Sequence, residues 1–134
     1  IKNKAKKVFQ TQKDIIFAYL FGSLAKRDVS SRSDIDLAVY LKEDLSCDER
    51  FEKRLELIGQ LQAHPPAPFV DLIVLNDTPI LLSFNVIREG ELLLCRDEFE
   101  RIHFEAKTMS MFYDQQYYFK RHAELVISRM AAGR

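Results

Sequence analysis

The chain has 134 residues, of which 47% are apolar and 30% are charged, a composition typical of one globular, soluble domain. Its 20 Lys and Arg residues balance its 20 Asp and Glu residues, so there is no overall basic charge to hold long RNA or DNA. We therefore expect no long nucleic acid as a partner.

The two cysteines, Cys47 and Cys95, have neither the paired spacing nor the nearby histidines of a zinc site. They indicate a reducing, cytoplasmic compartment rather than a disulfide framework. No apolar run approaches the ~18 residues of a membrane span, and no signal peptide is recognisable, so we expect no membrane partner. Because the first residue is not methionine, we expect the natural start to lie upstream.

The N-terminal third predicts a helix followed by two strands. Lysines surround Val8 and Phe9 in the first fourteen residues, a pattern typical of a short amphipathic helix with a solvated basic face. The run from Ile15 to Phe21 is β-branched and aromatic, which favours a strand buried on both faces. A second strand follows a polar connection and ends near Leu41.

Gly22 and Ser23 interrupt the first strand and predict a tight turn. Glycine lets a ligand approach the backbone closely, and serine adds a hydroxyl and an amide that can bind phosphate oxygens. Alone, this pair is a common turn. Lys26 could face a polyphosphate or be ordinary surface charge, and Ser33 ends the polar connection before the second strand.

Two carboxylates open the second strand. Asp34 and Asp36 are separated by one residue, so they point to the same face of a strand. The alternate residues can bury themselves on the other face; they are Ile35, Leu37, Val39 and Leu41. Because paired carboxylates repel each other unless a cation lies between them, the pair predicts a Mg²⁺ site.

A helix is predicted from about Glu49 to Ala63, with Ser46 or Asp48 as its N-cap. Its apolar residues recur at spacings of four, three and three, which predicts that one stripe faces the core. That stripe comprises Phe51, Leu55, Ile58 and Leu61.

A third strand is predicted from Phe69 to Leu75, and Asp71 is its one charged residue. An acidic side chain seldom stays buried without a partner, so Asp71 must reach a cation or line a cleft. If this strand pairs beside the second, Asp71 joins Asp34 and Asp36 in one cluster. The alternative is an edge-strand aspartate in water.

The C-terminal part predicts a helix from Ile80 to Arg88, a strand from Glu91 to Cys95, and a helical tail from Asp97 to about Met130, in one or two pieces. The tail keeps an apolar helical stripe of Ile102, Met109, Phe112, Phe119, Ala123, Val126 and Met130. Such a stripe is most often core. Its additional tyrosines favour packing of part of the tail on another subunit, as a homo-dimer or a hetero-oligomer.

Together these elements predict an α/β (α+β) domain across residues 1–134, with a core at about 15–97 and a helical tail at 98–131. The expected architecture is a small mixed β-sheet flanked by helices.

The segments FGSLAK, SDIDLAVYL, VDLIVL and PILLSFNVIREGELLL resemble the DNA polymerase β-like nucleotidyltransferase superfamily. The Gly22-Ser23 pair, ten intervening residues and Asp34-Ile35-Asp36 resemble its signature, and the short chain resembles its minimal nucleotidyltransferases. One departure is Arg27, where relatives often carry glycine; it puts the shape of this loop and its nucleotide contacts in question.

The resemblance implies a nucleotidyltransferase fold and a role for each of these residues. Asp34 and Asp36 would coordinate two Mg²⁺ ions that hold the triphosphate of ATP, and Asp71 would share a metal and help activate the attacking hydroxyl. Gly22 and Ser23 would bind the β and γ phosphates.

The resemblance also implies an acceptor. Many such proteins are antitoxins that transfer AMP from ATP to a tyrosine of a HEPN-domain RNase toxin. The absence of an acceptor-binding domain, the neutral charge and the aromatic tail favour this function here. One alternative is a small-molecule nucleotidyltransferase similar to the aminoglycoside-modifying enzymes; the other is an antitoxin that inhibits by binding alone.

Overall fold

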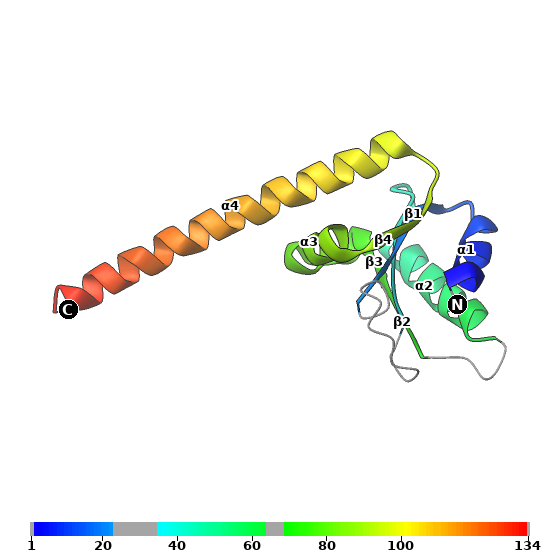
Figure 1. Cartoon of the computed structure of the whole chain (residues 1–134), viewed down its shortest axis with the longest axis horizontal. Helices are drawn as coiled ribbons and strands as arrows, with labels where there is room; N and C mark the ends of the chain where they lie inside the picture. Colours follow the sequence, from blue (N-terminus) through cyan, green and yellow to red (C-terminus); the bar gives the residue numbers. More distant parts are fainter. Residues whose placement is uncertain (1, 23–34, 64–68, 134) are drawn as a thin grey trace.

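A computed structural model describes residues 2–22, 35–63 and 69–133. Its elements along the chain are α1 (Lys2–Gln10), β1 (Ile15–Phe21), β2 (Ile35–Leu41), α2 (Cys47–Leu61), β3 (Val70–Val74), the 3₁₀ turn η1 (Leu75–Asp77), α3 (Ile80–Glu89), β4 (Glu91–Cys95) and α4 (Glu98–Ala131) (Figure 1). The strands form one sheet in the order β3-β2-β1-β4. Because β2 and β3 are parallel whereas β1 is antiparallel to both β2 and β4, the sheet is mixed, and the predicted α/β (α+β) class is confirmed.

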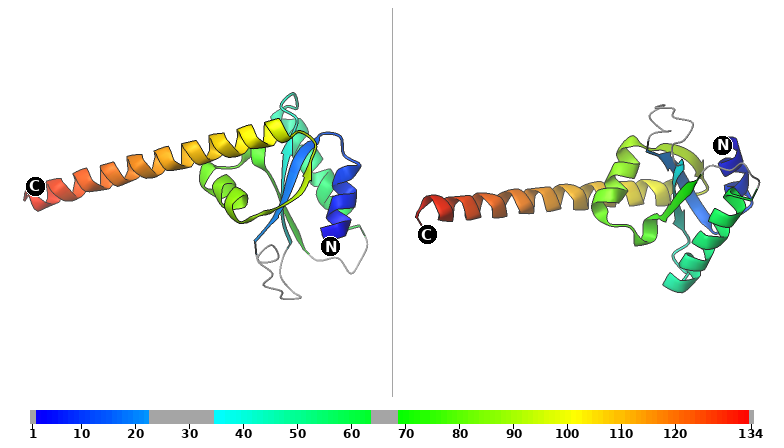
Figure 2. Two further views of the ribbon diagram at one scale, coloured as in Figure 1. Left: turned by 45° about the horizontal axis from the view of Figure 1, so that its top comes forward. Right: turned by 90° about the horizontal axis from the view of Figure 1, so that it is seen from below.

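Helices cover both faces of this sheet, and Figure 2 shows α1 and α2 on one side and α3 and the start of α4 on the other. The alternation along β2 explains the first layer, because Ile35, Leu37 and Val39 are all buried against α1 and α2. The second layer gathers Phe17, Tyr19 and Tyr40 with Phe104 of α4; rings of Phe17 and Tyr40 stack with centroids 4.7 Å apart. β1 is therefore buried on both faces, as its composition predicts.

The predicted core stripe of α2 is wrong at two of its four positions. Phe51 is 56% exposed and Leu55 is 51% exposed, whereas Leu57 and Leu61 are buried and Ile58 is half-buried. Polar contacts to β3 and η1 accompany this orientation of the helix. The Arg54 Nε donates to the carbonyl of Leu72 at 2.7 Å, and the Arg50 guanidinium pairs with Asp77 at 2.8 Å.

The α2 helix begins with a reciprocal capping box that sequence analysis indicated in part. The Ser46 hydroxyl accepts from the Glu49 amide, and the Glu49 carboxylate accepts from the Ser46 amide. We expect Ser46→Ala to lower the free energy of unfolding by about 1 kcal/mol, measured by urea denaturation. Ser128→Ala, on an exposed part of α4, should change it by less than about 0.5 kcal/mol. An equal effect of both substitutions would contradict a stabilising cap.

The tail is one continuous helix of 34 residues, α4, that begins with Asp97 as N-cap. Its first turns are fixed to the sheet, because the Tyr19 hydroxyl of β1 donates to Glu105. Within α4, Arg101 pairs with both Glu98 and Glu105. Burial and the Glu105 carboxylate together raise the pKa of Tyr19 above its ordinary value, which keeps the phenol protonated as a donor.

The prediction that the tail stripe is mostly core is wrong beyond the first turns. Thr108 is the one buried residue of α4 in the described part of the chain, whereas Phe119 is 62% exposed and Met130 is 69% exposed. A helix of this length spans about 50 Å, while strands of five to seven residues span roughly 17–23 Å, so α4 outruns the sheet. Figure 1 shows its C-terminal half projecting past α3.

Within the described ranges, no helix has both the length and the apolar character needed to span a membrane.

Candidate active site

Three strand ends meet at one end of the sheet. The C-terminal end of β1 lies against the N-terminal end of β2, because these strands are antiparallel, and Phe21 is the register partner of Asp36. The parallel pairing of β2 with β3 places Asp36 opposite Asp71. Residues that are in register on neighbouring strands point to the same face, so the two carboxylates lie side by side on strands about 4.8 Å apart.

The sequence predicts that Asp71 lies near Asp36 if their two strands are neighbours in the sheet. In the structure they are, because β3 pairs with β2. Asp36 is half-buried. Asp71 is exposed on β3, which is one of the two edge strands of the described sheet, so the edge-strand alternative also describes its exposure correctly. The buried residues of β3 point to the α2 side and leave the Asp71 side chain on the opposite face.

Gly22 closes the site from the end of β1. Its φ is +78°, a backbone conformation that residues with a Cβ rarely adopt. A Cβ at this position would lie 2.2 Å from the Oδ2 of Asp36. The backbone of Gly22 therefore packs directly on the carboxylate, and only glycine satisfies both the conformation and the space.

The other predicted site residues are Ser23, Lys26, Ser33 and Asp34, and all of them lie outside the described residues. The structure thus brings together Gly22, Asp36 and Asp71. The roles of all seven residues remain predictions.

The donor set fits a divalent cation. Two carboxylates on adjacent strands supply the hard oxygen ligands that Mg²⁺ prefers, and they repel each other by about 1 kcal/mol at this spacing in water. In the part of the chain that the structure describes, no three His, Cys, Asp or Glu side chains converge closely enough to hold a metal. Asp36 and Asp71 would therefore be two of the ligands, with Asp34 as the predicted third.

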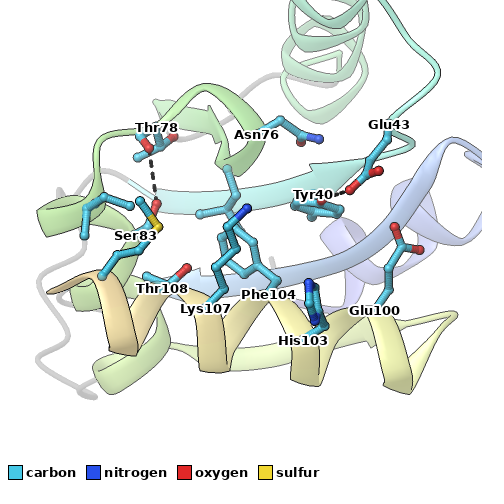
Figure 3. A pocket seen from close by; sticks show the side chains of 13 residues that line it. Tyr40, Glu43, Asn76, Thr78, Ser83, Glu100, His103, Phe104, Lys107 and Thr108 are labelled. Carbon is cyan, nitrogen blue, oxygen red and sulfur yellow. Dashed lines mark hydrogen bonds between the residues drawn. The ribbon is translucent and has the colours of Figure 1, made fainter. Parts of the chain in front are cut away.

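A separate cavity of about 280 Å³ lies between η1, α3, α4 and the far end of β2 (Figure 3). The Tyr40 hydroxyl donates to Glu43 at 3.0 Å there, and burial together with that carboxylate raises the pKa of Tyr40 to about 12. Tyr40 is four residues beyond Asp36, roughly 13 Å along the strand, and neither Asp36 nor Asp71 lines the cavity. It is distinct from the carboxylate site.

Sequence analysis did not anticipate this cavity, because its polar side chains come from segments far apart in the chain. His103 and Lys107 reach it from α4, whereas Asn76 and Thr78 come from η1 and the residue that follows it (Figure 3). The sequence indicates only that the residues of α4 that line the cavity are spaced three and four apart and therefore share one face of the helix. It does not indicate which segments lie opposite that face.

Comparison with protein families gives one match. The family described as polymerase beta, nucleotidyltransferase matches residues 3–99, well over half of the chain, and this range includes Gly22, Asp36 and Asp71. No curated protein matches the chain significantly.

Several solved structures are similar to nearly the whole chain. One is a toxin-antitoxin with AMP-PNP, at 27% identity and a TM-score of 0.71, with 94% of this chain and 98% of that chain covered. The toxin-antitoxin MntA-HepT is 26% identical at a TM-score of 0.65, with 94% and 96% covered. A tri-AMPylated Shewanella oneidensis HEPN toxin in complex with an MNT antitoxin gives 26% identity and a TM-score of 0.64, with 94% and 95% covered.

Proposed function

Because the chain belongs to the polymerase beta nucleotidyltransferase family, we propose that it transfers AMP from ATP to a hydroxyl of a HEPN-domain toxin and thereby acts as its antitoxin. The observation that carries the proposal is the pairing of Asp36 with Asp71 directly in front of Gly22. Support for the acceptor comes from similar solved structures, one with AMP-PNP and one with an AMPylated HEPN toxin.

In the proposed reaction, the acceptor hydroxyl oxygen attacks the α-phosphorus of ATP in line with the leaving group. The bond between the α-phosphorus and the oxygen that bridges to the β-phosphate breaks, and pyrophosphate leaves with that electron pair. Two Mg²⁺ ions, when bound, stabilise negative charge on the attacking and leaving oxygens. Asp34 and Asp36 would hold the metal-bound triphosphate, and the Gly22 and Ser23 backbone would contact the β and γ phosphates.

Asp71 has the position expected of the group that prepares the acceptor. It lies on the exposed edge strand, next to Asp36 but on the side away from β1 and Gly22. An acceptor hydroxyl can therefore approach Asp71 from solvent without crossing the phosphate side of the site. The Asp71 carboxylate would orient this hydroxyl and accept its proton as the new bond forms.

We further propose that residues 1–134 form a single nucleotidyltransferase domain, with its catalytic part at about 15–97 and α4 serving partner binding. Tyrosine is the proposed acceptor side chain. Both cysteines are free, and the reaction uses ATP, which together fit a cytoplasmic location.

The proposal predicts that the neighbouring reading frame encodes a HEPN-domain protein, and that protein is the substrate for the test. Incubated with the purified chain, ATP labelled on the α-phosphate and Mg²⁺, this protein should gain label, and mass spectrometry should place AMP on a tyrosine. Label should be lost when EDTA is added. A toxin that is inhibited but unmodified would instead establish inhibition by binding alone, and AMP on an aminoglycoside but not on the toxin would establish a small-molecule enzyme.

A further inference from the structure

The part of α4 that follows Thr108 carries a heptad repeat that is apolar at six of its seven seam positions. Beyond the buried Thr108, seam positions recur at alternating spacings of three and four residues. These positions, called the α4 seam below, are Met109, Phe112, Gln116, Phe119, Ala123, Val126 and Met130. A spacing that averages 3.5 residues is that of the a and d positions of a left-handed coiled coil, here over three heptads and about 30 Å.

The first residues of the α4 seam lie in the interface between α4 and α3, and the later ones lie beyond it. The Phe112 ring stacks on Phe84 of α3, with ring centroids 3.8 Å apart. Phe119, Val126 and Met130 are 62%, 40% and 69% exposed, and the views in Figures 1 and 2 agree that this part of α4 runs clear of the sheet. In the described structure, the apolar seam of α4 therefore continues beyond Phe112 for about five turns without a covering element.

We propose that the α4 seam is one strand of an intermolecular coiled coil whose other strand is a helix of the acceptor protein. This inference rests on the proposed function, because it supplies the surface that holds the protein to be modified. Helical partners recognise such seams through side chains at the same 3-4 spacing. Leu81 and Leu82 are also exposed on α3, the helix that packs on α4, and they add to the apolar surface of the body of the chain.

Charge at the flanks of the seam favours a different protein over a second copy of this chain. The e and g positions beside the seam are Tyr113, Gln115, Lys120, His122, Ile127 and Arg129. Two are basic and none is acidic, so an identical helix in either orientation offers no carboxylate to Lys120 or Arg129. A partner helix with Glu or Asp at its flanking positions does, and such pairs set partner choice and register in coiled coils.

Holding the acceptor on α4 has a kinetic consequence. When the partner is bound to α4, its acceptor hydroxyl has an effective concentration at the active site on the order of millimolar. Transfer then does not require a separate diffusional encounter between the hydroxyl and the active site. The seam should therefore lower the KM for the acceptor protein. It should not change the rate of the chemical step, which depends on Asp36 and Asp71.

The test uses one substitution in the seam and one matched control on the polar face of the same helix. Phe119→Asp introduces a charge into the seam, and Ser128→Asp introduces the same charge at an exposed position outside it. Calorimetric titration without ATP should show Phe119→Asp binding the HEPN-domain protein at least ~30-fold more weakly, and Ser128→Asp within about twofold of the unmodified chain. With ATP, Phe119→Asp should raise KM and keep kcat at saturating acceptor.

Circular dichroism should show that both variants keep their helical content, because both substitutions are at exposed positions of α4. Asp36→Asn separates this inference from the proposed function, since that variant should bind the acceptor normally but transfer no AMP. Equal binding of Phe119→Asp and Ser128→Asp would overturn the inference and leave the proposed function standing. Light scattering that shows the chain alone to be a dimer, and Phe119→Asp to be a monomer, would overturn it in favour of a second copy.

Discussion

Asp36→Asn is expected to lower the rate of AMP transfer by at least ~10³-fold, equivalent to about 4 kcal/mol of transition-state stabilisation. The amide keeps the shape of the side chain but removes the negative charge from the position between Gly22 and Asp71. A metal–triphosphate complex then loses one anionic ligand at the centre of the site. Asp71→Asn should have a similar effect on kcat, because it removes the proposed proton acceptor.

The measurement is the initial rate of AMP incorporation into the HEPN-domain protein at saturating ATP and Mg²⁺. Asp44→Asn is the matched control, because Asp44 is an exposed carboxylate in the turn between β2 and α2, away from the strand ends that carry the site. It should retain at least half of the activity. If Asp36→Asn stays active while its thermal unfolding is unchanged, the carboxylate pair does not form the catalytic centre.

Two strands were predicted to the residue, whereas β3, predicted from Phe69 to Leu75, is one residue shorter at each end. β1 and β4 have the predicted limits, since each is a short apolar run bounded by polar residues or by glycine. In β2 both faces are largely buried, and the period of two residues places Asp36 on the face opposite to Ile35, Leu37 and Val39. The predicted polymerase β-like nucleotidyltransferase membership is confirmed by the family match.

The predictions of which helix face is buried were wrong where contacts with other segments determine the orientation of the helix. The apolar stripe of α2 was read from spacing alone, but Arg54 bonds to Leu72 and turns Phe51 and Leu55 to the outside. In α4 the stripe is real, yet there is no layer in the described fold to cover it beyond Phe112. Spacing shows that a helix has an apolar face; it does not show whether the same chain supplies the partner.

In the candidate active site too, local features were predictable from the sequence and contacts between distant segments were not. The local sequence predicts that Asp36 points away from the buried residues of β2, and this follows from period-two geometry. The meeting of Asp36 with Asp71 depends on a parallel pairing across the 28 residues between β2 and β3, which spacing alone left conditional. The contact of Gly22 with the Asp36 carboxylate depends on the register of β1 with β2, and neither strand's own sequence specifies that register.

Gly22→Ala is expected to reduce AMP transfer by ~10²-fold or more while lowering stability only modestly. An alanine at φ +78° is strained by roughly 1–2 kcal/mol, which a folded domain can tolerate. The larger effect is local: the new methyl would lie 2.2 Å from the Oδ2 of Asp36, so that carboxylate must rotate away from its place beside Asp71. Misplacing a catalytic group by about 1 Å is sufficient for a loss of this size.

Gly59→Ala is the matched control, because it makes the same substitution inside α2, where an added Cβ meets nothing within 4 Å. It should stabilise the chain by about 0.5–1 kcal/mol in urea denaturation, since alanine favours a helix more than glycine does, and leave transfer unchanged. Gly22→Ala should also require more Mg²⁺ for half-maximal activity, because the displaced Asp36 binds the metal less well. Full activity of Gly22→Ala would mean that the Asp36 carboxylate is free to move during catalysis, and that the close packing of Gly22 on it serves only the fold.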